Sequence, residues 1–230
     1  MARLSDPGST LMADGGYAVL RNGPGFALLR LPVYRFRPGH ADALHLDIWH
    51  EGINWCRDAG SYSYNTEPEL LNYFPGTRAH NTVAFDDRDQ MPRLGRFLFG
   101  AWLRPDELEW RPDEGFVRSG YTDYRGARHV REVKRHEHGW QVIDTISGFT
   151  KKAVIRWHLA KADWKLEGTV LSCDKVELAV SSPERFALRL VEMPESLHYL
   201  QKQLVPVLEI RCHTAGMVIT TITFKESASK

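Results

Sequence analysis

The sequence has few cysteines, no long apolar run and almost no net charge. Three cysteines, Cys56, Cys173 and Cys212, lie far apart and form no CxxC pair, so neither a disulfide framework nor a zinc ribbon is expected. No run of about 18 apolar residues occurs, which excludes a membrane-spanning helix. The net charge of +1 at pH 7 argues against nucleic acid as the main partner, because nucleic-acid-binding domains are usually strongly basic.

Lysine is also scarce, with 9 lysines against 21 arginines. Arginine binds carboxylates and sulfates through two parallel hydrogen bonds, so this neutral chain could still bind an acidic ligand locally. Codon bias from a GC-rich genome would produce the same excess. The hydrophobic content of 43% and charged content of 26% are typical of globular proteins and exclude intrinsic disorder.

The N-terminal residues differ in composition from the rest of the chain. Residues 1–16 are polar, contain several glycines and a proline, and lack the apolar stretch of a signal peptide. We therefore expect a leader or linker over residues 1–16 and one folded domain over residues 17–230.

From Tyr17 onward, short runs rich in Val, Ile, Thr and aromatic residues recur between turn residues. Their spacing of roughly 8–12 residues is typical of antiparallel β-structure. Residues 43–49 alternate strictly between apolar and polar or aromatic side chains, as a half-buried strand does. Only residues 67–74 read as helix, with Thr66 as a plausible cap. The predicted fold is all-β, a many-stranded antiparallel β-sandwich with one short helix.

Two polar patterns within these strands have ordinary structural explanations. His45, in the alternating run, is expected to be a surface or hydrogen-bonded sheet histidine. Residues 128–138 alternate basic and apolar side chains, which predicts a solvated strand face. A patch for an anionic polymer is the alternative there.

Candidate metal ligands lie where three predicted strands begin or end. His40 precedes the strand at 43–49, Asp58 ends its neighbour and His80 precedes a third strand. Two imidazoles and one carboxylate with an open fourth position suit zinc, and Asp42 or Asn81 could hydrogen-bond a ligating histidine. Spacing alone is weak evidence, because 10 histidines occur in the chain and purely structural roles would place them similarly.

Four motifs follow one another in this region: Gly-His-Ala-Asp-Ala-Leu at 39–44, Asp-Ala-Gly-Ser-Tyr-Ser-Tyr-Asn at 58–65, Arg-Ala-His-Asn-Thr-Val at 78–83 and Asp-Arg-Asp-Gln at 87–90. With these motifs the chain resembles the heparinase II/III-like polysaccharide lyase family, in its C-terminal β-sandwich domain. The resemblance covers nearly the whole chain from Asp14 onward.

The resemblance implies a chemistry. Lyases of this family act on uronate-containing chains such as heparin, heparan sulfate or alginate. They remove the proton at C5 of the uronate and expel the 4-linked sugar, which requires a base, an acid and a group that neutralises the carboxylate. In the family most of these groups come from an N-terminal α/α toroid, while the sandwich closes the cleft and adds a histidine. The family also implies export to the periplasm.

The family's residues carry over only in part. Its zinc ligands match His40, Asp58 and His80, and the resemblance implies a mainly structural zinc ion. The family's catalytic histidine in the sandwich lies two residues before the first ligand. That position is Pro38 here, which has no proton to transfer, so no residue is assigned a catalytic role. The adjacent Arg37 is a candidate for binding a substrate carboxylate instead.

Three more residues are substrate-binding candidates, each with a structural alternative. Tyr64 could carry a proton or stack on a sugar, or pack among other aromatic rings. Arg78 could pair with a substrate carboxylate, or with Asp58 or Asp86 within the protein. Asn81 could contact substrate beside His80, orient that histidine or satisfy a bulge.

We therefore expect a lyase domain that acts on an acidic polysaccharide by β-elimination. The roughly 16 residues before the first strand are too short to form a toroid, so that domain is expected in cis or in trans and the isolated chain is expected to be inactive. The alternative is a non-catalytic carbohydrate-binding or structural module, which Pro38 favours. A metal-dependent hydrolase ranks last, because Asp42 is its only candidate base.

Overall fold

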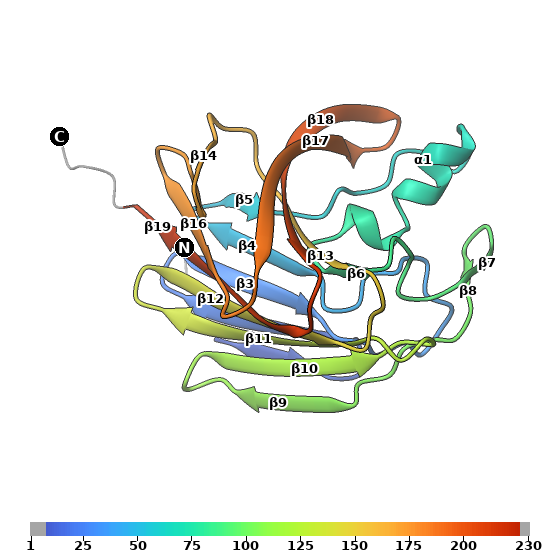
Figure 1. Ribbon diagram of the computed structural model, residues 1–230, viewed down its shortest axis with the longest axis horizontal. Coiled ribbons are helices and arrows are strands. Elements are labelled where there is room, and N and C mark those ends of the chain that lie inside the picture. Colours follow the sequence, from blue (N-terminus) through green and yellow to red (C-terminus); the bar gives the residue numbers. More distant parts are fainter. Residues whose placement is uncertain (1–7, 226–230) are drawn as a thin grey trace, which may run out of the picture.

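The computed structural model describes residues 8–225 and shows packed antiparallel sheets with one short helix, which confirms the predicted β-sandwich (Figure 1). Residues 1–7 of the predicted leader lie outside the described residues. Strand β1 (Thr10–Met12) falls within the predicted leader but pairs with β2 (Tyr17–Asn22), so residues 10–12 belong to the first sheet. Within residues 8–225, no helix is long and apolar enough to cross a membrane.

The first sheet has the strand order β1-β2-β3-β4-β5. Its further strands are β3 (Gly25–Arg30), β4 (Leu46–His50) and β5 (Ile53–Cys56). The tight turn between β2 and β3 uses Gly23 at a φ of 53°, a conformation that glycine adopts without strain. Strand β4 begins three residues later than the alternating pattern predicts, because Leu44 has a φ of 57° and breaks the extended backbone.

The second sheet has eight strands in the order β14-β15-β16-β19-β12-β11-β10-β9. In chain order these are β9 (Glu107–Arg111), β10 (Phe116–Thr122), β11 (Arg128–His136), β12 (Gly139–Ser147), β14 (Lys165–Glu167), β15 (Val170–Ser172), β16 (Val176–Ser181) and β19 (Gly216–Phe224).

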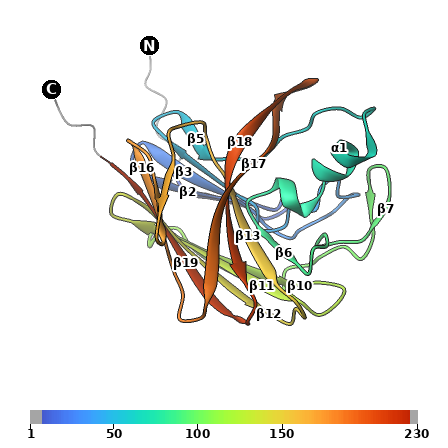
Figure 2. The same cartoon turned by 45° about the horizontal axis from the view of Figure 1, so that its top comes forward.

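The third sheet has the order β17-β18-β13-β6. It consists of β6 (Val83–Phe85), β13 (Ala153–His158), β17 (Phe186–His198) and β18 (Gln201–Cys212). Figure 2 shows the β17–β18 hairpin extending beyond the rest of this sheet. A separate short hairpin, β7 (Arg93–Gly95) and β8 (Leu98–Phe99), lies beside the helix at the end of the molecule opposite the described termini (Figure 1).

The predicted helix is present, but its cap is not. Helix α1 (Pro68–Tyr73) is followed by the 3-10 turn η1 (Thr77–Ala79). The N-cap residue is Glu67 and no side chain caps the helix, so the prediction of Thr66 as the cap is wrong. The Thr66 hydroxyl instead donates to the Glu67 carboxylate at 2.6 Å.

A single apolar core joins the three large sheets. Its buried members come from every layer, including Leu29, Ile48, Trp140, Trp157 and Leu208. The removal of these side chains from water is the main force that holds such layers together. Polar side chains buried in this core are exceptions to this rule, and each one marks a position where a specific interaction is needed.

The basic run at 128–138 is one such exception. His129 and Arg131 on β11 are fully buried, so the prediction of a solvated strand face is wrong for these two residues. Arg131 Nε and Nη2 bind the two carboxylate oxygens of Asp144 on β12 at 2.7 and 3.0 Å. Its Nη1 donates to the backbone carbonyls of Leu44 and Asn81. Arg131 thus ties the eight-stranded sheet to two loops on the other side of the core.

We predict that Arg131→Leu lowers the free energy of unfolding by about 3–5 kcal/mol, because the substitution leaves the buried Asp144 carboxylate without its cation. Arg128→Leu on the same strand is the matched control. Arg128 pairs with Asp106 and Glu107 at the partly exposed surface, where such pairs contribute at most about 1 kcal/mol. Chemical denaturation measures both, and equal losses would contradict the role of Arg131.

Candidate functional site

Three loops meet at the end of the sandwich where β4 begins and β5 ends. The β3–β4 loop carries His40, the segment after β5 carries Asp58, and the turn after η1 carries His80. The arginine described above holds two of these loops through the carbonyls of Leu44 and Asn81. The predicted metal ligands therefore lie on segments that the core fixes in place.

The three predicted ligands form a continuous chain of contacts. His80 is buried, and its Nδ1 lies 2.6 Å from Asp58 Oδ2. Its Nε2 lies 3.4 Å from His40 Nδ1. The other Asp58 oxygen accepts the Gly60 N–H at 2.6 Å. Asp58 and His40 thus contact opposite nitrogens of the same imidazole.

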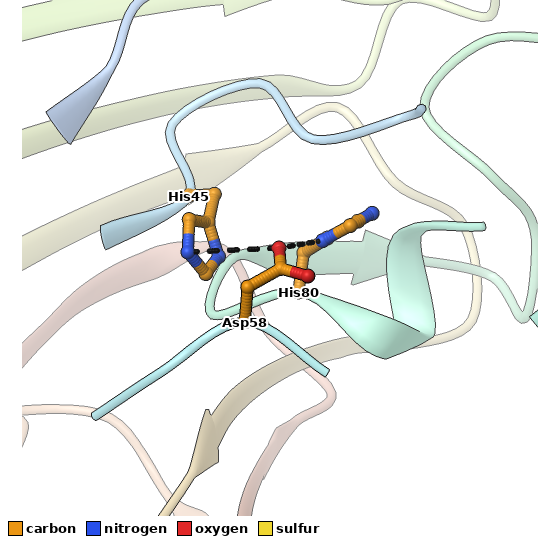
Figure 3. Close-up of side chains that lie close together, drawn as sticks. All are labelled: His45, Asp58 and His80. Atoms are coloured by element: carbon orange, nitrogen blue, oxygen red, sulfur yellow. Dashed lines mark hydrogen bonds and ion pairs between the residues drawn. The ribbon is translucent and has the colours of Figure 1, made fainter. Parts of the chain in front are cut away.

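His45 adds a fourth polar side chain to this group. His45 and His80 lie on either side of Asp58 (Figure 3), and ligand atoms of these three residues lie within 4.8 Å of one another. His45 Nε2 is 3.7 Å from Asp58 Oδ2 and 3.3 Å from Asp47 Oδ1. His45 is buried and hydrogen-bonded, in agreement with the sheet role predicted for it rather than with a surface position.

The protonation of His45 argues against its acting as a ligand. Its Nδ1 accepts the backbone N–H of Asn81 at 2.8 Å. A neutral imidazole that accepts at one nitrogen carries its proton on the other, so His45 Nε2 donates toward Asp47 and Asp58. We therefore assign His45 to orienting the carboxylates.

His40 and His80 fit a zinc ion better. Their facing nitrogens are 3.4 Å apart, and two ligands of a tetrahedral zinc ion with bonds of about 2.0–2.1 Å are separated by about this distance. Asp58 lies on the other nitrogen of His80, where a carboxylate either orients a ligating histidine or turns to ligate the ion itself. His40 and His80 are therefore placed to share a zinc ion, while Asp58 holds His80 from the opposite ring nitrogen. Direct ligation by Asp58 would require its side chain or the His80 ring to turn.

The ionisation of Asp58 and His40 agrees with such a role, whereas that of His80 does not. Burial opposes the charged form of His80, but the Asp58 carboxylate and its hydrogen bond raise the pKa of this histidine, so His80 would have to lose a proton to bind a metal ion. Burial alone would raise the pKa of Asp58, but the adjacent His80 and its hydrogen bond outweigh burial and hold that pKa well below its usual range. Burial and the neighbouring His80 lower the pKa of His40. A charged carboxylate and a neutral imidazole are the forms that bind a metal ion.

Asn81 is buried in the core and does not face a ligand. Its Nδ2 donates to the carbonyls of Leu46 and Arg57 at 3.0 and 3.2 Å, and its Oδ1 accepts the backbone N–H of His158 at 2.6 Å. Because every amide group is engaged, the prediction that Asn81 binds substrate is wrong. Asn81 instead joins β4, β13 and the segment just after β5 around the turn that carries His80.

Asn81 also leads to a polar pair that sequence reasoning missed. Its Oδ1 lies 3.2 Å from His158 Nδ1, and His158 Nε2 lies 3.3 Å from the hydroxyl of Tyr73 on α1. Burial lowers the pKa of His158 to about 3, so the ring is neutral and fixed between an amide and a phenol. The signal in the sequence is a histidine within the mostly apolar run 153–160, and the structure buries all six residues of β13 in that run.

The remaining predicted residues lie nearer the surface. Arg37 and Arg78 are exposed, Tyr64 is 57% exposed and Pro38 is buried. The suggested internal partners of Arg78 are engaged elsewhere, because Asp58 binds His80 and Asp86 accepts the backbone N–H groups of residues 150–152. Arg37, Tyr64 and Arg78 stay predictions as substrate contacts.

Asp42, suggested as a partner for a ligating histidine, also has other contacts. It accepts the Tyr34 hydroxyl at 3.1 Å and lies 3.6 Å from Arg30 Nε. These contacts fix the β3–β4 loop, and they leave Asp42 poorly placed as the base of a hydrolase.

We predict that Asn81→Ala and Arg78→Gln differ sharply in stability. Asn81→Ala leaves the His158 N–H and two carbonyls unpaired in the core and should cost about 1–3 kcal/mol or more in unfolding free energy. Arg78→Gln changes an exposed side chain and should cost under about 0.5 kcal/mol. Thermal and chemical unfolding of the two variants check this contrast, and a stable Asn81→Ala protein would contradict it.

The fold is similar to part of several solved polysaccharide lyases. A heparinase III aligns with a TM-score of 0.82 and 18% identity, over 98% of this chain and 37% of that protein. A mutant of the heparan sulfate lyase HepC from Pedobacter heparinus aligns with a TM-score of 0.75 and 19% identity, over 98% and 38% of the two chains. At these identities the likeness shows the fold alone.

A more distant likeness extends to another lyase. A chondroitin AC lyase mutant from Streptomyces coelicolor A3 aligns with a TM-score of 0.55 and 14% identity, over 98% of this chain and 34% of that one. The chain thus spans less than two-fifths of the length of these solved lyases.

At the level of sequence, no curated protein matches the chain. Residues 5–197, however, match the family described as heparinase II/III-like, C-terminal. That match covers most of the chain and includes the loops of His40, Asp58 and His80. The chain therefore belongs to the heparinase II/III-like family and corresponds to its C-terminal domain.

Proposed function

We propose that this chain is the C-terminal β-sandwich domain of a polysaccharide lyase that cleaves a uronate-containing polysaccharide by β-elimination. The observation that carries the proposal is the family match over residues 5–197. The structural likeness to heparinase III and to a heparan sulfate lyase supports it. Because the chain spans less than two-fifths of those lyases, most of the catalytic groups are proposed to lie in an α/α toroid outside these 230 residues. A periplasmic location also stays a prediction.

In this proposal the chain's own residues bind the substrate and do not transfer the proton at C5. Pro38 offers no group that can accept or donate a proton, so the base and acid of the elimination are assigned to the toroid. The exposed guanidiniums of Arg37 and Arg78 flank the loops of His40 and His80. Guanidinium groups bind carboxylates in bidentate fashion, and neutralising the uronate carboxylate favours removal of the adjacent proton.

We further propose that His40, Asp58 and His80 hold a zinc ion. When bound, such an ion would supply cross-links between three loops rather than a reactive water. The loops are already positioned by Arg131 and Asn81. The ion would add a further link between the His40 loop, which Arg131 holds at Leu44, and the turn that carries His80.

Zinc content distinguishes His40, a proposed ligand, from His45, which also lies beside Asp58 and His80 but is not one. We expect about one zinc ion per chain in the purified protein, lost in His80→Ala and His40→Ala and kept in His45→Ala, because His45 Nε2 carries a proton. Elemental analysis after dialysis measures the ion, and circular dichroism confirms that each variant is folded. Zinc kept by His40→Ala and lost by His45→Ala would contradict the assignment, and so would a wild-type protein without zinc.

A non-catalytic carbohydrate-binding module is the second candidate function. The specific observation in its favour is the proline at position 38, where the family has a catalytic histidine. Such a module would bind an acidic polysaccharide without breaking it.

Elimination assays distinguish these functions. We expect the purified chain alone to form no unsaturated product from heparosan, heparan sulfate or alginate. Combined with the proposed toroid domain, supplied in cis or in trans, it should do so, with ultraviolet absorbance of the unsaturated uronate as the readout. Strong activity of the chain alone would contradict the assignment of base and acid to a toroid. Binding without elimination in the combined protein would favour the module.

A further inference from the structure

A small cavity lies next to the proposed metal site and shares one residue, His40, with it. It has a volume of about 180 Å³ and lies between α1, the 59–66 segment and the β7–β8 hairpin, with His40 on one wall. These elements form one end of the molecule (Figure 1). Ligand sites for larger molecules usually exceed about 300 Å³, so this cavity is sized for a single ring.

Aromatic rings make up much of the cavity wall. Of its lining residues, Phe74 and Phe99 are buried, whereas Tyr64 and Phe97 are 57% and 50% exposed. The Tyr64 and Phe97 rings meet edge to face with centroids 5.1 Å apart. Half-exposed aromatic rings that converge on one opening are typical of a binding surface, and their flat faces suit the apolar face of a sugar ring.

The charge of the cavity has one sign. Arg93 and Arg96 line it together with His40, and none of its lining residues carries a carboxylate. Arg93 Nη1 donates to the carbonyl of Leu71 and the amide oxygen of Asn72, which fixes its guanidinium in place. Among residues 8–225, no carboxylate pairs with Arg93 or Arg96, whereas surface arginines such as Arg128 do pair with acidic groups.

We propose that this cavity is the subsite for one uronate residue of the acidic polysaccharide. The sugar ring would lie against Tyr64 and Phe97, and its carboxylate would face Arg93 and Arg96. Unpaired guanidiniums beside aromatic rings select an anionic sugar over a neutral one, because only the anion satisfies their charge. The proposal rests on the proposed function, since that function supplies an acidic polysaccharide as the ligand.

Binding of defined oligosaccharides to the full chain tests the subsite. One probe is a heparosan tetrasaccharide, which alternates glucuronate and N-acetylglucosamine, and the neutral comparison is chitotetraose. Titration calorimetry and NMR chemical shifts should show binding of heparosan at least about tenfold tighter than chitotetraose, the order expected for one charge-assisted contact. Arg96→Gln and Tyr64→Ala should each weaken heparosan binding about tenfold. Arg185→Gln, an exposed arginine outside the cavity, should leave it unchanged.

Each outcome bears on the cavity or on the lyase proposal separately. No heparosan binding, equal binding of chitotetraose, or binding that Arg96→Gln and Tyr64→Ala leave intact would overturn the subsite. Arg96 lies in the exposed turn of the β7–β8 hairpin, so its loss does not threaten folding, and unchanged melting curves establish this. Suppose that heparosan binding depends on Arg96 but that the chain together with the toroid domain does not eliminate. This result would support the subsite and contradict the lyase. Elimination by the combined protein that Arg96→Gln leaves unchanged would support the lyase and contradict the subsite.

Discussion

The buried ion pair of Arg131 and Asp144 is the constraint on which the functional end of this molecule depends. Neither side chain is exposed to water, and a buried charge is tolerated only when it is paired and fully hydrogen-bonded. The guanidinium satisfies this condition by also binding the carbonyls of Leu44 and Asn81. One of these residues precedes His45 and the other follows His80, so the same interaction fixes the backbone of both loops.

The site is consequently layered. Arg131 and Asn81 hold the loop backbones from inside. Asp47 on β4 accepts the backbone N–H of Asp58, and His45, just before β4, faces the Asp58 carboxylate. The proposed zinc ligands lie outside this layer, and the cavity beside His40 lies farther out still. A rigid interior that supports a more open ligand surface is the arrangement that accurate binding requires.

Much of this arrangement could be predicted from the sequence, because the patterns involved are local. The sheets could be predicted from the alternation of side chains and from the turn residues. The proximity of Asp58 and His80 could be predicted because each lies at the end of a strand. The roles of Asn81, Arg131 and His158 could not be predicted, because each depends on long-range pairing. Asn81 joins β4, β13 and the segment just after β5, and the basic pattern around Arg131 is equally typical of a solvated strand. The shared cavity wall of Tyr64 and Phe97 likewise arises only when the β7–β8 hairpin packs against the 59–66 segment.

The most direct measurement is a crystal structure of the zinc-treated protein soaked with the heparosan tetrasaccharide, recorded at the zinc absorption edge. We expect an anomalous peak bounded by His40, Asp58 and His80, and a glucuronate whose carboxylate lies against Arg93 and Arg96. No anomalous peak among these ligands would contradict the proposed metal site, and an empty cavity or sugar bound elsewhere would contradict the uronate subsite.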